Sequence, residues 1–260
     1  LGYRHERYGR QSRKHHALDL ADRRKAEQIQ PLTGSKEVIG MIMEEARKQI
    51  VEYGKRMSSS GLSVGTSGNI SVYDPETGYM AISPSGLGYF ETESEDIVVM
   101  TLDGEIVDGN RKPSSEHGLH TIVYKNRSEA RAVVHTHSPY ATTLAGLRTT
   151  LKPVHYAMMG ANVYEVPLVP YVTFGTPELA DAVGVVLVDN PRARAILLAN
   201  HGDVCFHINL AKAFGLAENV EFTSRIQWQC MCAGAPVNLT EAEFADALER
   251  SKTYGQQPAK

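Results

Sequence analysis

One short stretch, Val133-Val134-His135-Thr136-His137-Ser138, constrains this chain more than any other. It has the composition of a buried β-strand that ends in two histidines. Because successive side chains of a strand point to opposite faces, residues two apart share a face. His135 and His137 therefore project together from one end of a rigid element and form half of a site for a divalent metal. A His-x-His pair is also common in ordinary strands, so a metal site needs further ligands.

Two other segments supply such ligands. Glu116 stands at the predicted start of a helix, and His201 follows a buried strand. Each residue thus lies next to a sharp change of chain direction. One carboxylate and three imidazoles match the donors of zinc, which binds oxygen and nitrogen in tetrahedral geometry. The sequence predicts a zinc site made of Glu116, His135, His137 and His201.

Small residues and hydroxyls gather in three further places. Small-residue turns expose consecutive backbone N–H groups, which can cradle an anion. A helix start favours an anion through its free N–H groups and its dipole. Bare turns and an ordinary serine cap explain the same residues without a ligand. The candidate phosphate-binding residues are Gly68, Asn69, Ser85, Gly86, Ser114 and Ser115.

The composition argues against several classes of protein. A hydrophobic content of 42% is ordinary for a globular chain of 260 residues, and the net charge of -3 gives no case for nucleic acid or membrane binding. No apolar run is long enough for a membrane span, and the N-terminus lacks the apolar core of a secretory signal. The three cysteines indicate a reducing compartment rather than a disulfide framework. We therefore expect a cytoplasmic protein.

The order of the predicted elements indicates the fold class. We expect residues 1–34 to form a basic arm, to which we assign no chemistry, and residues 35–260 to form the domain that carries the predicted site. Hairpin signals such as Asp103-Gly104 are mixed with amphipathic helices rather than strictly alternating. This favours a single α/β domain with a central mixed, largely antiparallel β-sheet flanked by helices. Helices are expected over 35–54, 139–146 and 210–232, and strands over 163–169, 171–173 and 196–201.

The combined groups favour carbonyl chemistry on a phosphorylated sugar. A metal that chelates a carbonyl and the adjacent hydroxyl acidifies the carbon between them. A carboxylate such as that of Glu116 can then move the proton. Neutral donors around the phosphate leave the metal as the main positive charge of the site.

At these motifs the chain resembles the class II aldolase and adducin family. The resemblance covers about residues 36–255, and among the members it is most similar to the enzymes that cleave L-fuculose 1-phosphate. The matching stretches are Thr66-Ser67-Gly68-Asn69, Ser83-Pro84-Ser85-Gly86, Ser114-Ser115-Glu116, His135-Thr136-His137, His155-Tyr156, Tyr171-Val172-Thr173-Phe174-Gly175-Thr176, Asn200-His201-Gly202 and Lys252-Thr253-Tyr254-Gly255.

The resemblance implies an activity and residue roles. The reaction is a reversible retro-aldol cleavage of L-fuculose 1-phosphate, or a closely related deoxyketose 1-phosphate, to dihydroxyacetone phosphate and L-lactaldehyde, as in fucose degradation. One zinc ion per subunit is held by the three histidines, and Glu116 is a ligand that then serves as base and acid. Tyr156 reaches from a neighbouring subunit to protonate the aldehyde oxygen, and Tyr254 lies on a tail that closes the site. The family implies a homotetramer with active sites at subunit interfaces.

Relatives with other chemistry stay open. L-ribulose-5-phosphate 4-epimerases share the histidines but usually carry aspartate at the position of Glu116 and lysine at that of Ser83. Methylthioribulose-phosphate dehydratases share the histidines and the glutamate but match the turn motifs less well. Aldolases for other deoxypentulose or methylthio-sugar phosphates would differ only in the aldehyde pocket. An adducin-like scaffold keeps the fold without a metal site, and four intact ligand positions argue against it.

Overall fold

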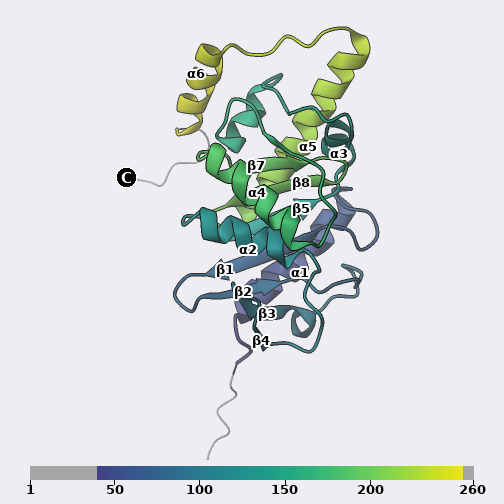
Figure 1. Ribbon diagram of the computed structural model, residues 1–260, viewed down its shortest axis with the longest axis vertical. Coiled ribbons are helices and arrows are strands. Elements are labelled where there is room, and N and C mark those ends of the chain that lie inside the picture. The colour runs from purple at the N-terminus through teal and green to yellow at the C-terminus, as the bar shows by residue number, and fades with distance from the viewer. Residues whose placement is uncertain (1–39, 254–260) are drawn as a thin grey trace, which may run out of the picture. The chain divides into compact units, whose positions relative to one another are not determined.

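An eight-stranded sheet forms the centre of residues 40–253, the part of the chain that the computed structural model describes (Figure 1). The strand order is β4-β3-β2-β1-β5-β8-β7-β6, and β6 and β7 are the parallel pair among otherwise antiparallel neighbours. The strands are β1 Asn69–Asp74, β2 Tyr79–Ile82, β3 Val98–Thr101, β4 Ile106–Asp108, β5 Ala132–Thr136, β6 Leu168–Val169, β7 Ala195–Leu198 and β8 Gly202–His207. The predicted mixed, largely antiparallel sheet is confirmed.

Helices cover both faces of this sheet. The α-helices are α1 Glu44–Ser59, α2 His117–Asn126, α3 Pro139–Gly146, α4 Pro177–Asp189, α5 Leu210–Ala233 and α6 Glu241–Ser251, and the 3-10 helices are η1 Ser94–Asp96 and η2 Tyr156–Ala161. In Figure 1, α2 and α4 lie in front of the sheet. The predicted helices over 139–146 and 210–232 are confirmed within a residue. The predicted arm over 1–34 lies outside the described residues, so the domain boundary stays a prediction.

The central strand β5 separates two hydrophobic cores. Ala132 and Val134 pack into the core shared with α1, α3 and α5, whereas Val133 packs into the core shared with α2 and α4. Alternation along the strand therefore assigns His135 to the α2 and α4 face and Thr136 to the opposite face. This placement directs the first histidine of the pair toward the start of α2.

A strand that the sequence analysis missed completes the site. We expected a strand over 196–201 followed by a helix from 210, but the chain turns at Asn200 (φ 54°) and returns as β8 between β5 and β7. Val204 and Phe206 pack into the core that contains α2 and α4, whereas Cys205 between them packs into the other core. This alternation is the sequence signal that could have predicted the strand. The return requires Gly202, because a Cβ there would lie 2.1 Å from the carbonyl oxygen of Thr136.

Two other expectations were wrong in their bounds. Only Leu168–Val169 is a strand within 163–173, because Pro167 and Pro170 lack the backbone N–H that ladder pairing needs. The first helix does not end at Gly54 but continues to Ser59, and Gly54 faces the ring of Tyr89 from inside the helix. The predicted start of this helix, at residue 35, lies outside the described residues. Within the described residues the helix begins at Glu44.

Within residues 40–253, none of the helices combines the length and the apolar character that crossing a membrane would require.

Replacing Gly202 with alanine should destabilise the domain. The new methyl group would overlap the backbone of β5, and overpacking of this kind costs about 3 kcal/mol in the free energy of unfolding. Urea denaturation measures the loss. The matched control is Gly215→Ala in α5, where the added Cβ meets open space and should raise stability by about 0.5–1 kcal/mol. An unchanged stability of Gly202→Ala would contradict the described approach of β8 to β5.

Candidate metal centre

Four residues from separate parts of the chain converge at one end of the central strands. His135 lies in β5, His137 directly follows it, His201 lies in the turn between β7 and β8, and Glu116 precedes α2. One ligand-capable atom of each lies within 4.8 Å of those of the others. The register of β5 against β8 pairs Thr136 with Asp203, so the end of one strand meets the start of the other. The structure thus brings the four predicted ligand residues together.

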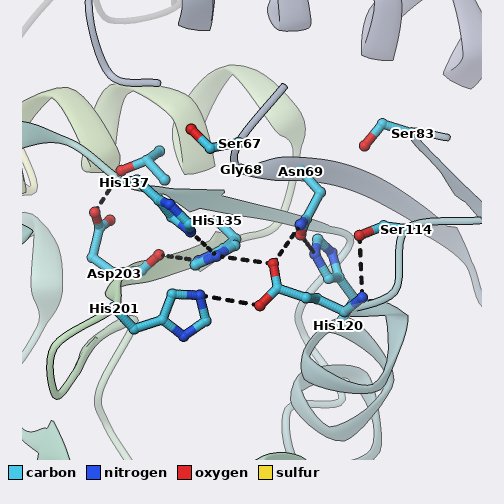
Figure 2. Close-up of polar contacts among 12 residues, drawn as sticks. Ser67, Gly68, Asn69, Ser83, Ser114, His120, His135, His137, His201 and Asp203 are labelled. Atoms are coloured by element: carbon cyan, nitrogen blue, oxygen red, sulfur yellow. Dashed lines mark hydrogen bonds and ion pairs between the residues drawn. The ribbon is translucent and has the colours of Figure 1, made fainter. Parts of the chain in front are cut away.

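The three imidazoles are arranged symmetrically around a common centre (Figure 2). Their ring centroids are 4.9 Å apart in each of the three pairs. The Nε2 atoms of His135 and His137 are separated by 3.0 Å. The carboxylate of Glu116 lies 3.3 Å from Nε2 of His135 and 3.1 Å from Nε2 of His201. Each ring therefore turns its Nε2 atom toward the same small volume.

The donor chemistry of this cluster fits a divalent cation. Nδ1 of His135 donates a hydrogen bond to the backbone carbonyl of Asp203 at 2.8 Å. In the neutral ring this bond leaves the lone pair of Nε2 facing the centre, which is the form that binds a metal. Oε1 of Glu116 is buried without a hydrogen-bond partner of good geometry among the described residues. A cation at the centre would satisfy both atoms.

Burial and neighbouring charges act in opposite directions on the ionisation of these groups. Burial raises the pKa of Glu116, but His135 and His201 outweigh it and hold the pKa well below its usual range. Burial and the two neighbouring histidines lower the pKa of His137 to about 4. For His135, burial lowers the pKa, but Glu116 and the Asp203 carbonyl outweigh it and raise it. Glu116 is thus an anion and His137 a neutral base at pH 7, as metal binding requires.

The sequence analysis overlooked Asp203, which supports the histidine pair from behind. Its fully buried carboxylate accepts hydrogen bonds from Thr136 Oγ1 at 2.5 Å and Ser138 Oγ at 3.3 Å. Cys205 Sγ donates to the second carboxylate oxygen at 3.4 Å. Burial raises the pKa of Asp203 to about 6. Asp203 belongs to the missed strand β8, so the sequence pattern gave no reason to place it beside the site.

A cavity of about 390 Å³ opens next to the cluster. Glu116, His137 and His201 line one part of it. The six predicted phosphate-binding residues line it as well: Gly68, Asn69, Ser85, Gly86, Ser114 and Ser115. The structure therefore gathers these residues into one cavity, while their role stays a prediction. Ser114 does not cap the first turn of α2 but accepts a hydrogen bond from the N–H of Glu116 at 3.2 Å.

The cavity also has an apolar wall, whose segment the sequence analysis named among the matching stretches without assigning it a role. It is formed by Tyr171, Val172 and Phe174, the segment between β6 and α4. The side chains of Tyr171 and Phe174 are largely exposed on the described chain. Tyr171 and Val172 lie in the stretch 171–173, which was wrongly predicted as a strand, and this concealed the position of the segment at the site.

Tyr156, one of the two predicted tyrosines, does not line this cavity in its own chain. Tyr156 begins η2, is 59% exposed and is absent from the residues that line the cavity of its own chain. Its ring contacts that of His155 in a tilted arrangement, with centroids 4.4 Å apart. Tyr254 lies outside the described residues. The roles of both tyrosines stay predictions.

Comparison with known proteins agrees with this geometry. The model of the Class II Aldolase and Adducin N-terminal domain matches residues 48–228. The 5-deoxy-D-ribulose 1-phosphate aldolase of Bacillus thuringiensis serovar kurstaki is 48% identical, with 84% of this chain and 100% of that protein aligned. The L-fuculose phosphate aldolase of Escherichia coli K12 is 35% identical over 80% of this chain and 94% of that protein. A solved structure of an L-fuculose 1-phosphate aldolase superposes with a TM-score of 0.76 and 39% identity, covering 80% of this chain and 96% of that one.

The chain belongs to the class II aldolase and adducin family. Within it, the chain is a class II aldolase, a carbon–carbon lyase. Class II aldolases depend on a metal, and the cluster of one glutamate and three histidines is the candidate site for it.

Removing the Asp203 carboxylate should lower the stability of the domain, because two buried hydroxyls next to the histidine pair would lose their acceptor. Asp203→Leu leaves the hydroxyls of Thr136 and Ser138 buried without an acceptor, which should cost about 3 kcal/mol in the free energy of unfolding. The double variant Asp203→Leu, Thr136→Val removes both partners of the shorter bond and should recover part of the loss. Urea denaturation of the unmodified protein, of the single variants Asp203→Leu and Thr136→Val, and of the double variant measures these differences. A double variant whose loss equals the sum of the two single losses would contradict the coupling.

Proposed function

We propose that this aldolase cleaves a terminal-deoxy ketose 1-phosphate to dihydroxyacetone phosphate and a short aldehyde. The observation that carries the proposal is the position of Glu116. Its carboxylate lies between the imidazoles of His135 and His201 and borders the cavity that the small-residue turns line. A proton-transfer group, a cation site and an anion-binding wall therefore adjoin one another.

Zinc is the cation that we propose, with His135, His137, His201 and Glu116 as its ligands. Three imidazole nitrogens and one carboxylate oxygen are a donor set that zinc prefers. When bound, zinc would polarise the substrate carbonyl and stabilise the negative charge that develops on its oxygen. The buried hydrogen bond from His135 to the Asp203 carbonyl supports this assignment, since metal-bound histidines commonly donate their other ring N–H in this way.

Glu116 is proposed to move the proton at C3 of the substrate. In the direction of synthesis its carboxylate removes a proton from dihydroxyacetone phosphate, and in the direction of cleavage it returns the proton after the C3–C4 bond breaks. Asn69 Nδ2 donates to Oε2 at 3.0 Å and holds one carboxylate oxygen in place. The other oxygen, Oε1, lies 3.1 Å from Nε2 of His201, and we propose that it serves first as a metal ligand and then moves the proton.

The phosphate group is proposed to bind the small-residue wall. Ser114 and Ser115 lie just before the N-terminus of α2, where free N–H groups and the helix dipole favour an anion. The turns at Gly68 and Gly86 face the same cavity and add backbone donors. Neutral donors hold the phosphate without competing with the cation for the sugar oxygens.

The apolar wall supports a methyl-terminated aldehyde. Tyr171, Val172 and Phe174 offer no charged group to a sugar hydroxyl, so this part of the cavity suits a terminal methyl group. Cleavage of 5-deoxyribulose 1-phosphate yields acetaldehyde, and cleavage of L-fuculose 1-phosphate yields L-lactaldehyde. Both products end in such a methyl group. The relative with 48% identity favours the first substrate, and the proposal includes both.

A homotetramer with active sites at subunit interfaces is proposed as the working form. Tyr156 is 59% exposed and lies outside the cavity of its own chain, which is the arrangement expected if it serves the site of a neighbouring subunit. It would then exchange the proton of the aldehyde oxygen, and Tyr254 would close the site. We place the enzyme in the cytoplasm, in the breakdown of deoxy sugars, supported by the free state of Cys205, Cys230 and Cys232.

The surroundings of Ser83 support the epimerase hypothesis less well than the aldolase hypothesis. Its buried Oγ accepts a hydrogen bond from the N–H of Ile70 at 3.1 Å, and its carbonyl oxygen accepts one from the N–H of Ser114. Ser83 thus joins the two turns that line the cavity. A lysine at this position, as in the epimerases, would lose the first of these contacts.

The experiment that tests the proposed function is a cleavage assay before and after chelation. Dihydroxyacetone phosphate formation is measured from 5-deoxyribulose 1-phosphate, L-fuculose 1-phosphate and methylthioribulose 1-phosphate. We expect activity on the first two that disappears with the chelator and returns with zinc. Failure of all three substrates with metal bound would reject the substrate class and direct the search to epimerase and dehydratase assays.

Glu116→Gln should retain the fold and lose kcat by about 100-fold to 10,000-fold, because the amide cannot accept the proton. His135→Ala should instead lower the bound zinc and the activity together. Steady-state kinetics and metal analysis on the same preparations separate the two effects. Glu105→Gln, in the exposed turn between β3 and β4, is the matched control. Full activity of Glu116→Gln would remove this residue from the mechanism.

A further inference from the structure

A continuous series of hydrogen bonds leads from Glu116 into the protein core. Figure 2 shows the part of the series that contains Asn69 and His120. Asn69 contacts Glu116 through Nδ2 at 3.0 Å and His120 through Oδ1 at 2.5 Å. The opposite ring nitrogen of His120, Nδ1, lies 2.6 Å from Ser71 Oγ. Ser71 Oγ in turn lies 2.7 Å from the hydroxyl of Tyr124. His120 and Ser71 are fully buried, so water does not replace any of these bonds.

The chemistry of the end members fixes the direction of every bond. The carboxylate of Glu116 only accepts, so Asn69 must turn its NH₂ group toward it. Oδ1 of Asn69 then needs a donor, which is the Nε2–H of a neutral His120. Nδ1 of that ring accepts from Ser71 Oγ, and Ser71 accepts from Tyr124. Burial lowers the pKa of His120 to about 3, in agreement with a neutral ring.

Helix and strand geometry explain why these groups meet. Glu116 is the N-cap residue directly before α2, and His120 lies four residues further on, in the first turn of the helix. Asn69 and Ser71 are two apart in β1 and share one face of the sheet. The helix packs this face against β1, so its histidine lies between the two strand side chains. Apart from Glu116, which directly precedes α2, every member of the series lies within β1 or α2.

We propose that His120 is a positioning residue for the proton transfer at Glu116. Its Nε2–H fixes which end of the Asn69 amide faces Glu116, and the amide in turn holds Oε2, while Oε1 faces Nε2 of His201. Without this donor, Asn69 can rotate and present its oxygen to the carboxylate, which repels it. This inference rests on the proposed role of Glu116 as the base and adds a residue that contacts neither substrate nor metal.

Kinetics of His120→Leu test the inference. Loss of a partner that orients a reacting or ligating group typically costs about 10-fold to 100-fold, and we expect this loss in kcat with KM changed by less than about 3-fold. His120→Gln retains an N–H donor and should stay within about 3-fold of the unmodified enzyme. His117→Gln, on the same helix but outside the hydrogen-bond series, is the matched control. Bound zinc per subunit should be equal in all of them.

A double-mutant cycle separates positioning from a general structural effect. If His120 acts through Glu116, adding His120→Leu to Glu116→Gln should lower kcat by less than about 3-fold further. A purely structural loss would multiply the two effects. Nitrogen-15 NMR of the histidine rings in the zinc-loaded protein gives a readout without substrate, and it should find His120 as the neutral Nε2–H tautomer at pH 7.

The outcomes are distinguishable. Full kcat in His120→Leu, multiplicative losses in the cycle, or an Nδ1–H or charged His120 would each overturn the positioning role. Full activity of Glu116→Gln would overturn the proposed function itself, whatever His120 does. If His120→Leu fails to fold, the kinetics of His120→Gln and the NMR tautomer still decide the question, since loss of activity in His120→Gln with zinc bound would contradict the inference.

Discussion

The pairing of β5 with β8 is the interaction on which the site depends. It places the end of the His135–His137 strand against the start of the strand that follows His201. It also brings the Asp203 carbonyl to Nδ1 of His135, which selects the tautomer with a free Nε2 lone pair. Gly202 permits the close approach of the two backbones. The metal-binding geometry is thus a property of the sheet register rather than of a flexible loop.

The second constraint is the burial of a carboxylate among histidines. A buried anion is costly unless charges and hydrogen bonds offset the lost hydration. Here the offset comes from His135 and His201 on one side and from the Asn69 amide on the other. The same contacts limit the orientations that Glu116 can adopt. The groups that stabilise the buried carboxylate are therefore the same groups that orient it for proton transfer. The hydrogen bond from His120 to Asn69 connects this set of groups to the core.

Much of the site could be predicted from the sequence, because its ligands are of types that local patterns reveal. The alternation of a strand was sufficient to pair His135 with His137, and the helix start was sufficient to single out Glu116. The rest depended on tertiary structure. Strand β8 was not predicted because it begins at Gly202, directly after the turn at His201 where the predicted strand ended. Asp203 was missed for the same reason. Only the packing of α2 on β1 reveals that His120 is fully buried. Segment 163–173 was wrongly predicted because its apolar residues outweighed its two prolines.

The central claim is that three imidazoles and one carboxylate hold a single cation. X-ray absorption spectroscopy of the full-length protein loaded with one equivalent of zinc tests it most directly. The account predicts three histidine nitrogens at about 2.0–2.1 Å and carboxylate oxygen at about 2.0–2.2 Å around one zinc ion, with no sulfur ligand. A shell that contains sulfur, or fewer than three histidines, would contradict the assigned centre and the mechanism built on it.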